Sequence, residues 1–440
     1  MKEEIETIFS ENAGIIHQSD MKTLTTFAQR LIFHALVFCG FCIALPPFFK
    51  SISIMLLALI LLASGELFRC KYTAKQIFDL RNPLFWLATL YILYCIGMFW
   101  SSNTAYGMMD LQIKLPLILL PFLFYFVPKQ HLDKKHLWIY ASAFIAGLII
   151  VLCYCLIHGF IKAFSGEGFR SEYLFYTRLA NEYHATYLSL FASVAILLSY
   201  KIPLTENFKF NQKQSAIIKA AFILFFDVFV ILLSSRIAFI AMSLVHLIIL
   251  SELLLSRTKY AKSAFFIIFS ALVVIATFNV KNYKQRYDNI GDRMNIETDV
   301  KLKKYSDSIS QRTFIYTNIH ELLLRSPFIG YGTGDTRDVL ENFYNERDVS
   351  FGRYLNAHNQ FLQTTVAIGV LGLACLVAVF VCFALRLWNK NGYVLLSGIA
   401  IIALFMMTES VLERQAGVHF CSFAFCWFYA ITCKDNKKED

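Results

Sequence analysis

Long apolar runs separated by short polar segments constrain this chain more than any other feature of its sequence. A run of about 18 or more apolar residues is long enough to cross the hydrocarbon core of a bilayer as a helix. Because lipid offers no water to unpaired backbone groups, such runs must form helices or a closed barrel. Barrel strands alternate apolar and polar residues, whereas these runs are continuous. The sequence therefore predicts an all-α, polytopic membrane protein.

The runs predict about twelve transmembrane helices. The chain is 57% hydrophobic and 16% charged, whereas soluble domains carry roughly 25% charged residues. The candidate spans are 31–49, 51–68, 84–100, 111–128, 137–161, 186–200, 215–234, 237–255, 263–280, 360–385, 393–408 and 416–433. This division gives an N-terminal tail (1–30), nine helices (31–280), one long loop domain (281–358), three helices (359–433) and a C-terminal tail (434–440).

The distribution of Lys and Arg predicts that both tails lie in the cytoplasm. With the N-terminus inside, the tails and short inner segments hold 21 Lys and Arg, and the short outer loops hold six. This asymmetry in short loops sets the orientation of a membrane protein. The long loop then lies on the outer face, where its own basic residues do not count against the assignment. We attribute the net charge of +10 to the basic inner loops and expect no nucleic-acid partner.

The N-terminus and the cysteines give two further expectations. The first thirty residues are polar, so no cleavable signal peptide is expected, and Met21 is an alternative start. Nearly all of the eleven cysteines lie in apolar runs, including the closely spaced Cys39 and Cys42. Such cysteines are typical of small hydrophobic residues in helices, so we expect neither a disulfide framework nor a metal site.

The outer segment 281–357 is too long, at 77 residues, to be a simple connector. Ser308 and Gln311 have the spacing of a capping box, and Pro327 marks a helix end. Between them, the stretch 310–325 predicts an amphipathic helix. Its apolar stripe consists of Ile315, Ile319, Leu322 and Leu323.

A Gly-x-Gly-x-Gly run, Gly330 to Gly334, follows this predicted helix. A nucleotide-binding interpretation is disfavoured, because the run follows a helix and its spacing differs from the dinucleotide fingerprint. The glycines are better explained by positive φ angles or a close backbone approach. Asp335 is expected to cap a second short helix that extends to about Asn345.

Three residues at the outer ends of helices are candidates for chemistry. Arg236 stands at the start of a span, where guanidinium and free backbone N–H groups together suit a phosphate, although a boundary arginine can also snorkel. Arg312 lies early in the loop helix, where a lone arginine is otherwise typical of a solvated face. His358 lies where the loop re-enters the membrane. Its imidazole can take a proton from a sugar hydroxyl, or it can serve as a helix cap.

Two further outer segments, 162–187 and 408–415, combine aromatic and charged residues that suit contacts with glycans and phosphates. Aromatic residues also form ordinary belts at membrane interfaces. The candidate substrate-binding residues are Arg178, His184, Tyr187, Asn359, Glu409 and Arg414. For the adjacent Glu413 and Arg414, a mutual salt bridge and a place in an acceptor site both stay open.

The order of these features resembles the O-antigen ligase/polymerase superfamily of bacterial integral-membrane glycosyltransferases. The matching parts are Ser-Arg-Ile-Ala at 235–238, Arg312 in the outer loop, Ser-Pro-Phe-Ile-Gly-Tyr-Gly at 326–332, His-Asn-Gln-Phe-Leu at 358–362 and Gly-Val-Leu-Gly-Leu at 369–373. The core of the resemblance covers about 220–380. The number of spans and the place of the long loop extend it to most of the chain.

The resemblance implies about a dozen helices with a helical periplasmic domain over a cavity, in the bacterial inner membrane. It implies a donor glycan on undecaprenyl diphosphate and a metal-independent, inverting transfer without a cofactor. Arg236 and Arg312 would then hold the donor diphosphate. His358 would act as the general base on the acceptor hydroxyl.

The leading hypothesis is an O-antigen ligase-type transfer of a glycan to a lipid A-core sugar. A repeat-unit polymerase and a protein O-oligosaccharyltransferase share the donor chemistry and differ only in the acceptor. A transporter or flippase also suits twelve spans. Against it, the two halves of the chain show no internal repeat, and few charged residues lie deep in the spans, chiefly Lys114, Lys219 and Asp227.

Overall fold

The computed structural model describes residues 27–165, 168–255, 270, 308–347, 356–388 and 392–433. Every regular element within these ranges is helical, which confirms the all-α class. The helices are Phe27–Cys42, α2 (Pro47–Ala63), α3 (Ala74–Ile77), α4 (Pro83–Gly97), α5 (Thr104–Lys114), α6 (Pro116–Phe124), α7 (Lys134–Phe164), α8 (Tyr176–Ala180), α9 (Ala185–Lys201), α10 (Leu204–Asn207), α11 (Gln212–Leu232), α12 (Arg236–Leu255), α16 (Ser308–Arg325), α17 (Thr336–Asn345), α18 (Gln360–Trp388), α19 (Tyr393–Met406) and α20 (Gln415–Cys433). Short 3-10 turns include η5 (Val411–Glu413).

Six helical segments in the described ranges are long and apolar enough to cross a membrane. They are Pro83–Trp100, Thr104–Phe124, α7, Arg236–Leu254 of α12, α11 and α18. Shorter apolar helices fall on the predicted spans 31–49, 51–68, 186–200 and 393–408. The predicted span 263–280 lies outside the described residues. The chain is therefore a multi-pass membrane protein, and the total of about twelve spans stays a prediction.

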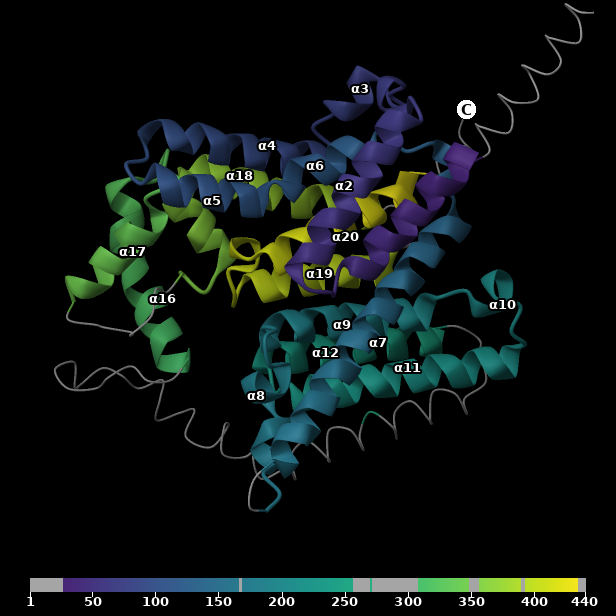
Figure 1. Cartoon of the computed structure of the whole chain (residues 1–440). Helices are drawn as coiled ribbons and strands as arrows, with labels where there is room; N and C mark the ends of the chain where they lie inside the picture. The colour runs from purple at the N-terminus through teal and green to yellow at the C-terminus, as the bar shows by residue number, and fades with distance from the viewer. Residues whose placement is uncertain are drawn as a thin grey trace, which may run out of the picture.

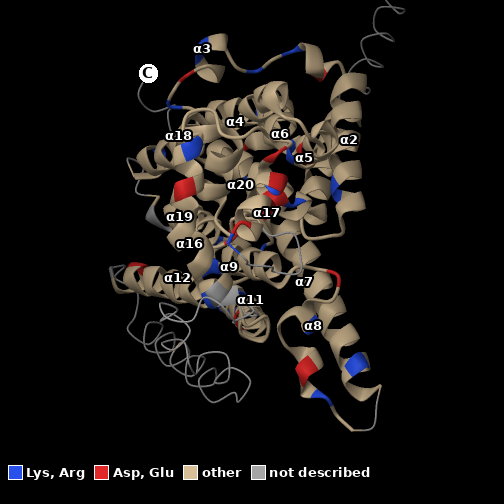
Figure 2. Ribbon diagram, turned by 90° about the vertical axis from the view of Figure 1, so that its left-hand side faces the viewer, with Lys and Arg blue, Asp and Glu red and all other residues tan. Residues whose placement is uncertain are grey.

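The long helices pack in two groups that α19 joins (Figure 1). In the first group, α4 lies against α18 and α6, and α6 lies against α20. In the second, α9 lies against α11 and α12. Because α19 contacts α18, α9 and α12, one continuous apolar core runs through both groups. Few charges interrupt it: most of the ribbon in Figure 2 carries neither acidic nor basic residues.

The loop helices and α10 lie toward opposite ends of the bundle. In Figure 1, α16 and α17 stand at one end, and α10 stands toward the other. This arrangement agrees with the prediction that the long loop and the segment between the spans 186–200 and 215–234 lie on opposite faces of a membrane. Which face is cytoplasmic stays a prediction from the positive charges.

The first predicted loop helix is confirmed. α16 ends at Arg325, and Ile315, Ile319 and Leu322 of its predicted stripe are buried. They pack with Leu340 and Phe343 of α17 in a second, smaller core outside the main bundle. The loop helices therefore stabilise each other through apolar burial of their own.

α17 also exists, but the expectation that Asp335 caps it is wrong. The Asp335 carboxylate makes no cap bond to α17. Its oxygens accept the backbone N–H groups of Ser102 (2.8 Å) and Asn103 (2.7 Å), just before α5. The N–H groups ahead of a helix need acceptors, and Asp335 supplies them from a distant segment. It thereby docks the loop onto the bundle.

The segment after α16 docks onto an interruption in α18. Ile368 and Gly369 have non-helical dihedral angles, which leaves backbone groups of α18 without helical partners. The loop supplies those partners: the N–H groups of Tyr331, Gly332 and Val370 donate to the carbonyls of Val366 (2.8 Å), Ala367 (2.9 Å) and Pro327 (2.8 Å). This confirms that the glycine run serves a close backbone approach.

Gly369→Ala is expected to destabilise the fold by about 2 kcal/mol or more. Its φ is +68°, and an added Cβ would lie 2.1 Å from the carbonyl oxygen of Phe328. Gly65→Ala is the matched control, because Gly65 has a φ of +70° but no atom within 4 Å of the added Cβ. Thermal unfolding of the purified protein compares the two. Equal losses would contradict the close backbone approach.

Candidate functional site

His358 is held in a strained backbone conformation at the start of α18. Its φ is +46°, a region that non-glycine residues occupy at a cost of about 1–3 kcal/mol, typically at functional sites. Its N–H donates to Asn356 (3.0 Å), and its carbonyl accepts from the Tyr316 hydroxyl (2.8 Å). Asn359 accepts the N–H groups of the first turn of α18 and so serves as a helix cap. Three residues thus fix the backbone that presents the imidazole.

Arg312, Glu409 and His358 form one cluster, although they come from three separate segments. Nη2 of Arg312 lies 3.3 Å from one carboxylate oxygen of Glu409, and Nδ1 of His358 lies 3.6 Å from the other. Arg312 also donates from Nε to the carbonyl of Thr408 (3.1 Å). The structure therefore brings together three residues that the sequence analysis selected independently. We name them the Arg312–Glu409–His358 cluster.

Glu409 is the anion at the centre of this cluster, and only 5% of its surface is exposed. Burial alone raises the pKa of a carboxyl group. The adjoining His358, with the charges of His184 and Arg312, outweighs burial and lowers the pKa of Glu409 to about 2. Glu409 is therefore ionised at neutral pH. It can hold the imidazole of His358 in place.

His184 and Tyr187 lie beside this cluster. His184 stands directly before α9, with its ring 5.1 Å from the ring of Tyr187 in an edge-on arrangement. The Tyr187 hydroxyl donates to the carbonyl of Ser410 (3.2 Å), next to Glu409. Burial lowers the pKa of His184. Tyr187 is thus placed by the segment that carries Glu409, and His184 packs against Tyr187.

Arg236 is the first residue of α12, two residues after Ser234, whose φ is +48°. α12 packs against α9 and α19, which are the helices next to His184 and Glu409 in the sequence. Arg236 therefore has the predicted position at a helix N-terminus. Its role toward a phosphate stays a prediction.

Arg178 lies on the surface, where its guanidinium pairs with Glu172 and stacks on the ring of Tyr173. About half of the Arg178 side chain is exposed. Neither Arg178 nor these two partners lines the cavity described next. The structure therefore places this candidate apart from the others.

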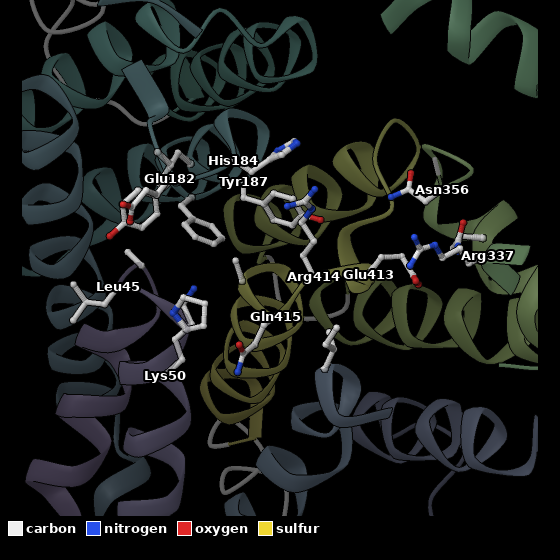
Figure 3. Close-up of a pocket in the computed structure, with 18 of the residues that line it drawn as sticks. Leu45, Lys50, Glu182, His184, Tyr187, Arg337, Asn356, Glu413, Arg414 and Gln415 are labelled. Atoms are coloured by element: carbon white, nitrogen blue, oxygen red, sulfur yellow. The ribbon is translucent and has the colours of Figure 1, made fainter. Parts of the chain in front are cut away.

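A cavity of about 560 Å³ is lined by His184, Tyr187 and Asn356 (Figure 3), which lie beside the Arg312–Glu409–His358 cluster. Six parts of the chain contribute to its wall. They are four helices (α2, α5, α17 and α18), the loop that precedes α9, and the segment that precedes α20. Its polar lining residues are Lys50, Tyr106, Glu182, Tyr183, His184, Tyr187, Arg337, Asn356, Gln363, Glu413, Arg414 and Gln415. Three predicted residues, His184, Tyr187 and Arg414, are among them. Its volume lies in the range of about 300–1,000 Å³ that small-ligand sites occupy.

Sequence reasoning missed most of this lining. Lys50 and Arg337 stand in segments that carry no motif, and they line one cavity with Arg414 although the three residues are far apart in the sequence. The one available signal was the basic residue at Lys50, directly after an apolar run, which is also typical of a membrane boundary.

Glu413 and Arg414, left open by the sequence, have different partners. Glu413 lies 2.9 Å from the ammonium group of Lys114, which is completely buried and also lies 2.5 Å from Asp110. The same ammonium group lies 4.8 Å from the ring centroid of Tyr94. Glu413 thus belongs to a buried ion-pair network, and Arg414 lines the cavity as an exposed cation.

Glu409→Gln tests the charge at the centre of the cluster. A carboxyl group with a lowered folded-state pKa stabilises the fold above its ordinary pKa of 4.5, and this contribution is lost as the pH falls through about 2. We expect the variant to lose up to about 3 kcal/mol of unfolding free energy at pH 7. The difference from wild type should shrink below pH 4.5.

Thermal unfolding of the purified protein between pH 7 and pH 3 measures this difference. Glu346→Gln is the control, because Glu346 is about half exposed and its pairs with Arg325 and Arg347 are 3.7 and 3.8 Å long. Such surface pairs contribute about 0–1 kcal/mol. A Glu409→Gln effect that did not change with pH would contradict an ionised Glu409.

Comparison with known families assigns this region. A model of the O-antigen ligase family matches residues 220–377. The match covers most of α11, all of α12, the long loop and the first part of α18, and it includes Arg236, Arg312 and His358. Among curated proteins, none matches the chain. The resemblance drawn from the motifs is thereby confirmed, and the chain carries the domain of the O-antigen ligase superfamily.

Proposed function

We propose that this protein is an O-antigen ligase-type glycosyltransferase at the periplasmic face of the bacterial inner membrane. It moves a glycan from undecaprenyl diphosphate to a hydroxyl group of a lipid A-core sugar. The observation that carries the proposal is the Arg312–Glu409–His358 cluster beside a large cavity, with Arg312 and His358 inside the matched O-antigen ligase region. The cluster combines a base, an orienting anion and a phosphate-binding cation.

His358 acts as the general base. Nδ1 faces Glu409, and no described residue hydrogen-bonds to Nε2, which leaves that nitrogen to accept the proton of the acceptor hydroxyl. The hydroxyl oxygen then attacks the anomeric carbon of the donor sugar. The bond from that carbon to the diphosphate oxygen breaks, and its electron pair leaves with the diphosphate. Attack from the side opposite the leaving group inverts the anomeric centre.

Glu409 supports this proton transfer through its charge. Protonation turns His358 into a cation, and a buried carboxylate 3.6 Å away stabilises that cation as it forms. The same carboxylate orients the ring, as the acid does in a Ser-His-Asp triad. A positioned base of this kind contributes about 10²–10⁴-fold to the rate.

Arg312 and Arg236 neutralise the departing diphosphate. A guanidinium has five N–H donors in a planar fork, so Arg312 can hold Glu409 and also contact a phosphate oxygen. Arg236 adds the positive end of a helix dipole. Two guanidinium groups then stabilise the growing negative charge, the task that a metal ion performs in many phosphate-dependent enzymes.

His358→Asn should lower the rate of glycan transfer about 10²–10⁴-fold without unfolding the protein. Asparagine tolerates a positive φ, so the variant removes the base while it keeps the backbone conformation. His320→Ala is the matched control, because His320 is an exposed histidine of α16. Transfer from a lipid-linked donor in proteoliposomes measures the rate. Wild-type activity in His358→Asn would remove His358 as the base.

Deletion of the gene in its host, with surface glycolipids separated on a gel, tests the acceptor. The ligase predicts that polymerised glycan disappears from the lipid A-core and accumulates on the carrier lipid. Wild type should restore the pattern, and His358→Ala should not. A lipid A-core with a single repeat unit would identify a polymerase instead. Unchanged glycolipids with loss of sugars from glycoproteins would identify a protein oligosaccharyltransferase.

A further inference from the structure

Lys50 is a buried cation that faces the cavity. It lies in the first turn of α2, and 3% of its surface is exposed. Within the described part of the chain, its ammonium group forms neither an ion pair nor a hydrogen bond, while the side chain lines the cavity (Figure 3). An unpaired charge in an apolar environment is costly. Lys50 therefore has the properties of a group whose partner is a ligand.

A second cation without an ion-pair partner among the described residues lines the same cavity. Arg414, an exposed cation, lines the same cavity and forms no ion pair with a described residue. The carboxylate of Glu413 is bound to Lys114. Glu182, the other acidic lining residue, is exposed and is not paired with Lys50. Lys50 and Arg414 are therefore two cations of the described lining that no carboxylate neutralises through an ion pair.

The rest of the lining suits a sugar. Tyr106, Tyr183 and Tyr187 offer aromatic rings, whose flat apolar faces pack against the C–H face of a sugar ring. Asn356 and Gln363 add amide groups that donate to and accept from hydroxyl groups. The cavity thus combines aromatic and amide groups that can contact a sugar ring with a cation that can bind an acidic substituent of that sugar.

The cavity wall also reaches the proposed base. The Asn356 side chain accepts the N–H of His358 (3.0 Å), and the Gln363 side chain accepts the N–H of Ala357 (2.8 Å). Both amide residues line the cavity, whereas His358, Arg236 and Arg312 do not. A sugar in the cavity would therefore lie beside the backbone that presents the base, which is a place for the acceptor.

We propose that this cavity binds an anionic sugar of the glycan acceptor, and that Lys50 selects the carboxylate or phosphate group of that sugar. The inference rests on the proposed transfer reaction and deepens it by naming the acceptor's chemical class. A lysine ammonium binds carboxylate or phosphate as a compact point charge. Lys50 is a specificity-determining residue in this arrangement, and the proton transfer stays with His358.

Calorimetric binding to the full-length protein in detergent tests the selectivity without a donor. The probes are a glucuronic acid disaccharide, glucose 6-phosphate and, as neutral reference, glucose. We expect at least one of the two acidic probes to bind. Tighter binding of the glucuronic acid disaccharide would identify a carboxylate as the recognised group, and tighter binding of glucose 6-phosphate would identify a phosphate. Lys50→Met should weaken that binding about tenfold or more, and Lys50→Arg should retain most of it. The exposed Lys162→Met is the matched control and should bind like wild type.

Thermal unfolding separates this effect from a folding defect. Lys50→Met removes an unpaired buried charge, so its unfolding temperature should equal or exceed that of wild type. The exposed Arg414→Gln provides a second variant, with a smaller loss of acidic-probe binding. Unchanged acidic-probe binding in folded Lys50→Met, or equal binding of glucose and the acidic probes by wild type, would overturn the proposal.

Transfer assays in proteoliposomes then distinguish this inference from the proposed function. Lys50→Met should raise KM for an acidic acceptor and leave KM for the lipid-linked donor unchanged. Selective acidic-probe binding by a protein that transfers no glycan would support the cavity's selectivity and refute the transfer reaction. Glycan transfer with no preference between acidic and neutral acceptors would refute the role of Lys50 and retain the enzyme.

Discussion

The site depends on the ion pairs of the buried Lys114 ammonium group. It has no exposed surface and lies between the carboxylates of Asp110 and Glu413. In a low-dielectric interior, a charge without its partners costs several kcal/mol. The segment between α19 and α20 must therefore stay where Glu413 reaches Lys114. Gln360 fixes the same segment from α18, because its side-chain oxygen accepts the N–H of Leu412 (2.6 Å). This segment also carries Glu409. The contacts of Glu413 with Lys114 and of Leu412 with Gln360 therefore also fix the position of Glu409.

The site then follows from three segments that meet at one end of the bundle. α16 brings Arg312, the start of α18 brings His358, and the fixed segment supplies Glu409 between them. Each segment is positioned by apolar packing or backbone hydrogen bonds away from the reacting groups. Because the contacts that position each segment lie away from the three side chains, the side chains stay close to one another and the cavity beside them stays large enough for a substrate. The opposed effects of burial and neighbouring cations on Glu409 are a direct result of this convergence.

Local patterns predicted the parts of this fold that local physics determines. The apolar spacing of Ile315, Ile319 and Leu322 predicted both the helix and its buried face, and the glycine run predicted a close backbone approach. Partners that are distant in the sequence could not be predicted. Lys114 had the pattern of an isolated charge in a span, and nothing local marks Glu413 as its partner. Asp335 had the spacing of a helix cap, but it bonds to the segment before α5. Lys50 could equally stand at any membrane boundary, and only its place in the cavity makes it a candidate.

The interruption of α18 gives the long loop a fixed point of attachment. The loop is bonded to Val366 and Ala367 before Gly369 and, through Pro327, to Val370 after it. The helix before the interruption is itself tied to the bundle, because Thr364 is hydrogen-bonded to Tyr94 of α4 (3.1 Å). Glycine at position 369 permits the positive φ that this junction requires. The loop helices and the start of α18 therefore share one anchor, so that a change that loosened this junction would also release the backbone that presents His358.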